Sequence, residues 1–454
     1  MRFLKLVFSK LFICVFFIAA LVAAIIFLCL YIHSLLPVTA ALGLYYLLSV
    51  IAALSLMLAE SPSPFKCAWL VAVIALPVGG AVLYFLSYLS RCEQGEPTAL
   101  PPPCGCDGAL YFSDGADFLN GLIESVSLAK VSVRLEFYIF AKGEIWSRLC
   151  GELKGALSRG CKVLIIYDGL GSALRTPKRD FKALKRLGAQ IKVFNRLLPL
   201  PVSRLGFRDH RKIAAIDGER VFLGGVNIAD EYAHITAPHG HWKDGGALFK
   251  GQIAKVYEEI FDSLFDGIKT VENPPAPCGD FMITPVYDSP DERGSNYENA
   301  VAAAIYAAER RVWVFTPYLC MGDKLRDALI FSAASGRDVK IVIPYIPDKR
   351  LTYKITLACA HELREKGVDV QLYKPGFMHF KGVLCDGKAF VGSYNFDFRS
   401  MWLNHECGVY GEGELADGLA RDFEKTLPLC APLKPAGKAA RFFGRLFYLF
   451  APLV

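Results

Sequence analysis

The sequence predicts an α/β protein in which two duplicated α/β domains pack with pseudo-twofold symmetry, preceded by N-terminal transmembrane helices. Three observations support this prediction. Expected strands and helices alternate twice in the same order, one short polar motif occurs once in each repeat, and three long uncharged apolar stretches precede the repeats. Strands that alternate with helices are typical of a largely parallel sheet covered by those helices.

The apolar stretches lie at residues 11–32, 39–59 and 67–89, and none contains a charged residue. Each is long enough to cross a hydrocarbon core of about 30 Å as a helix. Pro77 lies inside the third stretch and predicts a kink there. We therefore predict a membrane-spanning region over residues 1–90, with two or three helices, in a multi-pass protein of the cell membrane.

The topology of these helices stays open. The first stretch is longer than the apolar region of a typical signal peptide, which favours an uncleaved anchor, although the basic residues before it leave a signal peptide as the alternative. The same basic residues favour a cytoplasmic N-terminus. Three full crossings would place the rest of the chain outside the cell. Two crossings and a re-entrant segment would leave it inside.

A linker rich in Pro and Gly covers residues 91–107, and the two repeats follow at residues 108–275 and 276–430. In the first repeat, helices and strands are expected to alternate over residues 118–128, 131–140, 145–157, 162–169, 178–186 and 190–195. In the second, they are expected to alternate over residues 297–308, 311–319, 324–334, 338–345, 353–366 and 369–374. The order is the same in both, so we expect two copies of one domain.

Each repeat carries one copy of a polar motif. The first runs from His210 to Asn227, HRKIAAIDGERVFLGGVN, and the second runs from His379 to Asn395, HFKGVLCDGKAFVGSYN. Both follow H-x-K-x4-D and then G-(G/S)-x-N. Apolar segments on either side of Asp-Gly predict a β-hairpin in each copy. We expect both hairpins to meet where the two repeats pack together.

The residue types of this motif indicate phosphoryl transfer. Alternation along a strand puts the His and Lys of H-x-K on one face, and the returning strand brings the Asn beside them. Lysine supplies positive charge and asparagine a neutral donor, which suits phosphoryl oxygens. One neutral imidazole can attack phosphorus while a second, protonated imidazole gives a proton to the leaving oxygen.

The composition narrows the partners of the chain. Of its 454 residues 53% are hydrophobic, and its net charge of +7 suits an anionic partner, either phospholipid or nucleic acid. Its fourteen cysteines are expected to be mostly reduced, and a disulfide in the C-x-C of the linker is the alternative. His234, His239 and His241 are close enough to suggest a metal, but we interpret them as a flexible loop and expect no metal.

The last segment, residues 431–454, is basic and amphipathic. Lys438, Arg441 and Arg445 alternate with Phe and Leu there. This pattern predicts a short interfacial helix on an anionic bilayer. The alternative is a terminal helix that packs its aromatic face on the domain.

The duplicated motif resembles the HKD motif of the phospholipase D superfamily, and within it the chain resembles the bacterial cardiolipin synthases. The segments that narrow the resemblance are EFYIF at 136–140, GGVNIADEY at 224–232, HWKD at 241–244 and FDFRSMWLNHE at 396–406. The resemblance covers nearly the whole chain, including its apolar start and its basic end. Cardiolipin synthases usually have two N-terminal spans, so one span here is extra.

The resemblance implies roles for the motif residues. His210 is expected to form a phosphohistidine intermediate and His379 to protonate the departing alcohol, although the two roles could be exchanged. The catalytic set of the motif is His210, Lys212, Asp217, His379, Lys381 and Asp386. The phosphoryl oxygens are expected to be bound by the two lysines, Asn227, Ser393 and Asn395. The first copy departs from the pattern, because Gly225 stands where the second copy has Ser393.

Two further carboxylates follow from the same resemblance. Asp244 and Glu406 are each expected to hold the far nitrogen of the motif histidine in the opposite copy. Asp217 and Asp386 follow the strands directly, so we interpret them as caps of the hairpin turns rather than substrate ligands.

The expected activity is that of a phosphatidyltransferase that makes cardiolipin from two molecules of phosphatidylglycerol. No cofactor is expected. The expected partners are phosphatidylglycerol and anionic membrane lipids, with no nucleic acid, since no ladder of aromatic and basic residues is present for stacking bases. The alternatives are a phospholipase D-type hydrolase, a phosphatidyltransferase with another acceptor, and an inactive lipid-binding protein. The sequence does not decide the oligomeric state.

Overall fold

The structure is a computed structural model, and it describes residues 26–27, 30–31, 38–58, 63–89, 100–195, 206–267, 281–290, 294–437 and 448. Most of the first predicted span, residues 11–32, lies outside the described residues, as does most of the predicted C-terminal helix. The chain divides into two compact units, of which the larger holds residues 95–194 and 208–452.

The described N-terminal part contains three helices, α3 (Val38–Leu58), α4 (Ser63–Ala75) and α5 (Pro77–Leu89). Tyr84 and Val73 belong to a small apolar core in which these helices pack together. The third predicted span is divided at Pro77 between α4 and α5. A Cβ on Gly80 would overlap the carbonyl oxygen of Ala72, which explains why glycine stands at this bend. Among the described residues, no helix reaches the length and apolarity that a membrane crossing requires.

The first sheet has seven strands in the order β2-β10-β8-β7-β3-β4-β5. Their bounds are β2 Gly108–Phe112, β3 Ser132–Phe137, β4 Lys162–Asp168, β5 Gln190–Phe194, β7 Lys212–Ile216, β8 Arg220–Gly224 and β10 Gly246–Lys250. The strands β3, β4 and β5 are parallel, and the other neighbours are antiparallel. The helices that pack on this sheet are α6 Gly115–Ser127, α7 Glu144–Ser158, α8 Lys178–Arg186 and α9 Gln252–Asp266.

The second sheet has ten strands and contains the order β11-β20-β18-β17-β12-β14-β15. Their bounds are β11 Phe281–Asp288, β12 Arg311–Phe315, β14 Asp338–Pro344, β15 Asp369–Tyr373, β17 Gly382–Cys385, β18 Lys388–Gly392 and β20 Asn404–Gly411. Strand β1 (Cys104–Cys106) extends it beside β11, and β21 (Cys430–Pro432) extends it beside β15. Its helices are α10 Asn296–Ala307, α11 Asp323–Ala334, α12 Arg350–Glu365, α13 Phe398–Trp402 and α14 Glu414–Thr426.

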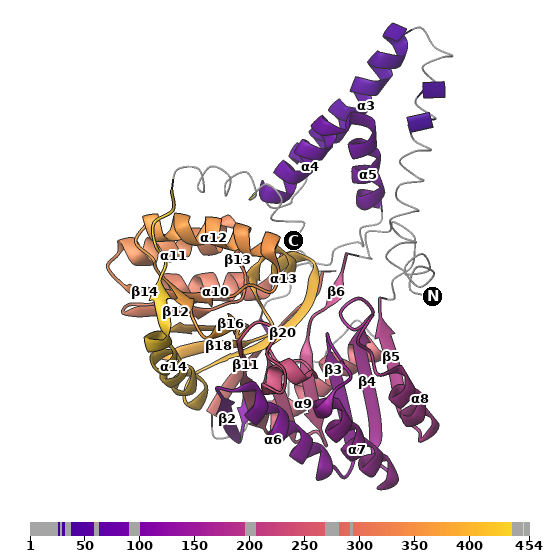
Figure 1. Cartoon of the computed structure of the whole chain (residues 1–454), viewed down its shortest axis with the longest axis vertical. Helices are drawn as coiled ribbons and strands as arrows, with labels where there is room; N and C mark the ends of the chain where they lie inside the picture. Colours follow the sequence, from indigo (N-terminus) through magenta and orange to yellow (C-terminus); the bar gives the residue numbers. More distant parts are fainter. Residues whose placement is uncertain are drawn as a thin grey trace. The chain divides into compact units, whose positions relative to one another are not determined.

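The two sheet orders match strand for strand, which confirms the predicted duplication. Figure 1 shows the same arrangement, with α6, α7 and α8 beside the first sheet and α10, α11 and α12 beside the second. In each copy the motif forms an antiparallel hairpin, β7 with β8 and β17 with β18, which lies next to a parallel set of three strands.

Among the described residues, two strand pairs join one copy to the other, and a third joins the predicted linker to the second copy. Strand β6 (Arg208–Asp209) pairs with β20, β9 (His241–Lys243) pairs with β16 (Gly376–Met378), and β1 pairs with β11. The end of the predicted linker is therefore a strand of the second sheet. Both cysteines of its C-x-C are buried and free, so the alternative of a disulfide there is wrong.

The apolar core between the two sheets depends on strand alternation. Along β7, Ala214 and Ile216 face the helices α6 and α7, whereas Ile213 and Ala215 face the second copy. Helix α14 of the second copy closes this shared core by packing on β2, β17 and β18.

Phe423 in α14 tests how much this shared core contributes to stability. It is fully buried and stacks on Trp313 and Phe315, with ring centroids 5.0 and 4.4 Å away. We expect Phe423→Ala to cost about 3–5 kcal/mol because it leaves a cavity between the sheets. Thermal unfolding of the protein in detergent measures this as a lower melting temperature.

The matched control is Phe331→Ala, which removes a phenyl group that is half exposed on α11. We expect it to cost less than about 1 kcal/mol. Equal melting temperatures for the two variants would contradict the role assigned to the shared core.

Candidate active site

The structure brings the two motif histidines together with the two motif lysines. His210 lies between β6 and β7, and His379 lies between β16 and β17. The backbone N–H of His210 donates to the carbonyl of His405, and that of His379 donates to the carbonyl of Lys243. Each histidine is therefore fixed by the backbone of the opposite copy.

Each imidazole is held by a carboxylate from the other copy, as the sequence predicts. Nδ1 of His210 lies 2.9 Å from Oε1 of Glu406, and Nδ1 of His379 contacts Oδ2 of Asp244. Both carboxylates are fully buried, and the imidazoles are about nine-tenths buried. Because Nδ1 of each ring faces a carboxylate, Nε2 is the ring nitrogen that can act on a substrate.

The two carboxylates have different surroundings. Glu406 accepts hydrogen bonds from the side chains of Ser393, Ser400 and Asn404. Asp244 accepts one from its neighbour, the N–H of Gly245, at 2.8 Å. A Cβ on Gly225 would overlap the carboxylate of Asp244, so the first copy has no room for the serine of the second.

The motif lysines are buried beside the imidazoles. Nζ of Lys212 donates to the carbonyl of His210, and Nζ of Lys381 donates to the carbonyl of His379. Nζ of Lys381 also lies 2.7 and 3.0 Å from the two ring nitrogens of His379. A phosphoryl group at the imidazoles would therefore meet two positive charges.

Burial shifts the pKa of every ionisable group in this site toward its neutral form. The pKa of Asp244 and that of Glu406 are each raised to about 7, because burial outweighs the attraction of the nearby lysines. Burial lowers the pKa of Lys381 to about 7 and that of Lys212 to about 8. An anionic ligand would stabilise the charged lysines again.

Both imidazoles are held in the neutral, nucleophilic form. Burial lowers the pKa of His210 well below its usual range, and the positive charges of Lys212 and Lys381 lower it further. The pKa of His379 is lowered well below its usual range by burial first and then by the same two lysines. The bound negative charge of a substrate would favour a proton on one of the two rings.

The side chains of the predicted phosphate ligands Asn227, Ser393 and Asn395 differ in the hydrogen bonds that they already make within the protein. The side chain of Asn227 accepts from the N–H of Ile139 and donates to the hydroxyl of Tyr232. The hydroxyl of Ser393 contacts Glu406 and the backbone of Cys407. Oδ1 of Asn395 is buried and has no hydrogen-bond partner among the described residues. Their contact with phosphate stays a prediction.

Asp217 and Asp386 lie at the hairpin turns, away from the imidazoles. Their φ angles are 59° and 53°, and each accepts three successive backbone N–H groups. Those amides lower the pKa of both carboxyls, which stay ionised. These contacts agree with the interpretation of the two aspartates as turn caps.

Among the described residues, four aromatic side chains surround the imidazoles. The sequence analysis predicted no role for any of them. Tyr138 lies 5.2 Å from His210 between ring centroids. The rings of Trp242, Tyr232 and Phe377 lie 5.3, 5.4 and 5.7 Å from His379. Tyr138, Trp242 and Tyr232 lie within the segments that carry the family resemblance, and this was the only sequence feature that could have pointed to them.

The predicted histidine loop divides into two parts. His239 packs its ring near Trp242 and Phe377, whereas His234 and His241 stack on each other beside Asp114. Asp114, His234 and His241 are the described group whose donor atoms lie close enough to hold a metal ion.

Comparison with known proteins gives consistent matches. A family model described as cardiolipin synthase, PLD-like domain, matches residues 122–264 and 301–427, and one described as phospholipase D-nuclease N-terminal matches residues 47–87. A cardiolipin synthase of Oceanobacillus iheyensis is 27% identical over 85% of this chain and 92% of its own length. One of Listeria welshimeri is 32% identical over 66% of this chain and 64% of its own length.

A solved structure shows the same fold. The crystal structure of phosphatidylserine synthase from Haemophilus influenzae superposes with a TM-score of 0.62 at 14% identity. The match covers 78% of this chain and 97% of that one.

Replacing the carboxylate behind His210 tests the crossed pairs. We expect Glu406→Gln to lower the turnover of phosphatidylglycerol by about 10²–10⁴-fold, because the amide cannot stabilise an imidazolium. The measurement is the rate of glycerol release from that lipid by the purified protein.

The control for this variant is Asp217→Asn, which neutralises the turn carboxylate of the first motif. Asparagine tolerates the positive φ of residue 217, so we expect turnover within about twofold of the original protein. Equal loss of turnover in both variants would contradict the division between imidazole partner and turn cap.

Proposed function

The chain belongs to the cardiolipin synthase, phospholipase D-like family, and we propose that it joins two molecules of phosphatidylglycerol into cardiolipin with release of glycerol. The crossed imidazole–carboxylate pairs carry this proposal. They place two ring nitrogens in one buried site with two lysines. Transfer of a phosphatidyl group through a covalent intermediate needs such a nucleophile, a proton donor and positive charge. The names of the two cardiolipin synthases described above support the choice of lipid.

In the first half-reaction, Nε2 of His210 attacks the phosphorus of one phosphatidylglycerol. The bond from phosphorus to the headgroup glycerol breaks, and the glycerol oxygen takes a proton from Nε2 of His379. Phosphatidyl-histidine and free glycerol result. Asp244 stabilises the protonated form of His379 before the transfer, and Glu406 stabilises the cationic ring of His210 after it.

In the second half-reaction, His379 acts as the base. It takes the proton of the terminal hydroxyl on a second phosphatidylglycerol, whose oxygen attacks the phosphorus. The bond from phosphorus to His210 breaks, and the ring leaves with its electron pair. The sum is two phosphatidylglycerols to one cardiolipin and one glycerol. Because each ring has a carboxylate, the same chemistry runs with the two histidines exchanged.

Lys212 and Lys381 hold the phosphoryl oxygens in this proposal. Each nonbridging oxygen carries part of the negative charge, and buried lysines attract it far more strongly than exposed ones. Oδ1 of Asn395 accepts hydrogen bonds, so it suits a hydroxyl of the lipid headgroup, and its amide nitrogen suits a phosphoryl oxygen. Asn227 and Ser393 contribute mainly by positioning, because their polar atoms contact the protein.

The membrane-spanning segments and the domain boundaries complete the proposal. We place residues 1–90 in the cell membrane as two or three spans, with residues 91–103 as the link to strand β1 and the repeats. The repeats occupy residues 108–275 and 276–430, strand β21 (Cys430–Pro432) ends the second sheet, and the basic residues of the tail after it rest on the bilayer. The apolar composition of the start and the basic, aromatic end support this placement.

The test supplies phosphatidylglycerol as the only lipid to the detergent-purified protein and follows three products. We expect cardiolipin and free glycerol in equal amounts, and none of either from His210→Asn or His379→Asn. Phosphatidic acid with glycerol but no cardiolipin would make the protein a hydrolase. Liposome binding by all three proteins without any product would favour the lipid-binding alternative.

The pKa shifts predict a bell-shaped pH dependence for kcat/KM. As the pH falls through about 7, Asp244 and Glu406 take up protons and the imidazoles lose their partners. As the pH rises through about 7 to 8, Lys381 and Lys212 lose the charges that attract phosphate. The maximum therefore lies between about pH 7 and 8.

Initial rates at subsaturating phosphatidylglycerol from pH 5.5 to 9.5 measure this profile, since the phosphodiester stays anionic throughout. A plateau that extends from pH 6 to pH 9 would contradict the assignment of these four groups.

A further inference from the structure

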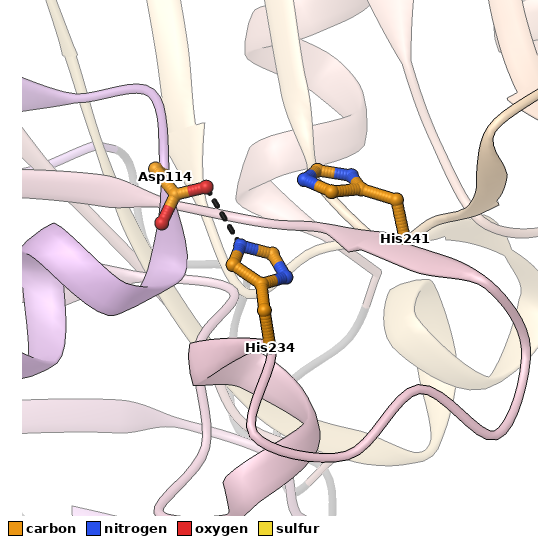
Figure 2. A group of neighbouring side chains, drawn as sticks. All are labelled: Asp114, His234 and His241. Atoms are coloured by element: carbon orange, nitrogen blue, oxygen red, sulfur yellow. Dashed lines mark hydrogen bonds and ion pairs between the residues drawn. The ribbon is translucent and has the colours of Figure 1, made fainter.

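Asp114, His234 and His241 meet outside the proposed catalytic pairs. Their donor atoms all lie within 4.8 Å of one another, although the residues come from three separate segments. Asp114 precedes α6, His234 ends the short 3-10 helix at Asp230–Ala233, and His241 begins β9. Figure 2 shows the carboxylate of Asp114 and the two imidazole rings turned toward one another.

The carboxylate of Asp114 divides its two oxygens between two tasks. Oδ1 accepts from the N–H of Ala116 at 2.8 Å and so caps α6, while Oδ2 lies 2.7 Å from Nε2 of His234. The cap fixes the side chain in one orientation. Oδ2 is thereby presented to the imidazoles without any rearrangement of the helix.

A hydrogen bond on the far side of its ring orients His241 for binding a metal ion. Nδ1 of His241 lies 2.9 Å from the hydroxyl of Tyr373, which is buried. Metal-binding histidines usually have their other nitrogen held in this way, which fixes the ring and its tautomer. The remaining nitrogen, Nε2, is the one that Figure 2 shows directed toward Asp114.

The rings of His234 and His241 are stacked on each other. Their centroids are 4.4 Å apart and their planes differ by 20°. Two protonated rings in this position would repel each other, so the arrangement suits neutral rings that offer their nitrogens to a cation. Lys243, two residues after His241, is paired with Asp422 at 2.6 Å, so its charge is largely balanced.

We propose that Asp114, His234 and His241 form a binding site for a divalent cation of the zinc class. Two imidazole nitrogens and one carboxylate oxygen suit this class, whereas calcium and magnesium favour oxygen ligands alone. A tetrahedral ion needs roughly 3.3 Å between donor atoms, so the Asp114–His234 contact opens by about half an ångström. Water takes the fourth position because the side chains of Asp114 and His234 are about one-third exposed.

The cation acts on the stability of the site rather than on the reaction. The loop that it closes, residues 234–241, begins two residues after Tyr232 and ends next to Trp242. These two residues pack their rings on His379. A bound cation therefore joins the start of α6, the loop and β9, and it fixes two aromatic neighbours of a motif histidine. This role does not depend on which lipid the protein uses.

Metal titration of the whole protein in detergent, after removal of metal with a chelator, tests the proposal. We expect one Zn²⁺ to bind per chain and to raise the melting temperature. His234→Asn and His241→Asn should weaken binding by more than about 100-fold, and Tyr373→Phe by about 10–100-fold because the ring of His241 loses its support. Asparagine at 234 tolerates the φ of 60° found there.

The matched control is His239→Asn, which changes a histidine of the same loop outside the cluster and should bind Zn²⁺ as the original protein does. Equal affinities in all variants, or no stoichiometric binding, would overturn the proposal and leave a hydrogen-bonded helix cap. X-ray absorption of the zinc-loaded original protein needs no variant. It should report two imidazoles and oxygen ligands, and sulfur ligands would refute the site because they would place the ion on cysteines.

Discussion

The structure depends on two imidazole–carboxylate pairs that cross between the copies. His210 is held by Glu406 of the second repeat, and His379 is held by Asp244 of the first. Neither repeat therefore supplies the carboxylate that holds its own motif histidine. The same exchange occurs in the backbone, where β6 pairs with β20 and β9 pairs with β16. Strands that cross the boundary bring the carboxylates within hydrogen-bond distance, so the duplication is a requirement of the site and not only a repetition of a stable domain.

Burial of these charged groups costs free energy that neighbouring hydrogen bonds must offset. Carboxylates and lysines removed from water tend toward their neutral forms, as the pKa values near 7 of Asp244, Glu406 and Lys381 show. Glu406 is supported by two hydroxyls and an amide. The two carboxylates already attract both lysines, but burial still lowers the pKa of each lysine. A bound phosphodiester adds negative charge and favours the charged form of both lysines.

Much of this arrangement could be predicted from sequence because it rests on local patterns. Strand alternation and Asp-Gly turns located the hairpins, and motif spacing located His210, His379 and their lysines.

The sequence missed what depends on contacts between distant segments. The strand formed by the C-x-C was interpreted as linker because its partner, β11, lies far along the chain. Asp114 is far from His234 and His241 in the sequence, and no local pattern links the three residues. The sequence therefore indicated only a loop of histidines and not their cluster with Asp114. Tyr138 and Trp242 lie within the segments that carry the family resemblance, but only the packing shows which imidazole ring each one contacts.

The difference between the two copies follows from steric limits rather than from loss of function in one of them. In the second copy, Ser393 donates to the longer Glu406. In the first, the shorter Asp244 occupies the space next to residue 225, where any Cβ would overlap it. Glycine with aspartate and serine with glutamate are thus two solutions to one requirement, a carboxylate held against Nδ1 of an imidazole. The second solution supplies more hydrogen bonds to its carboxylate, so the ring of His210 has the more rigid partner. A ring that must carry a covalent group benefits more from a fixed orientation than one that only exchanges a proton, which favours His210 as the nucleophile.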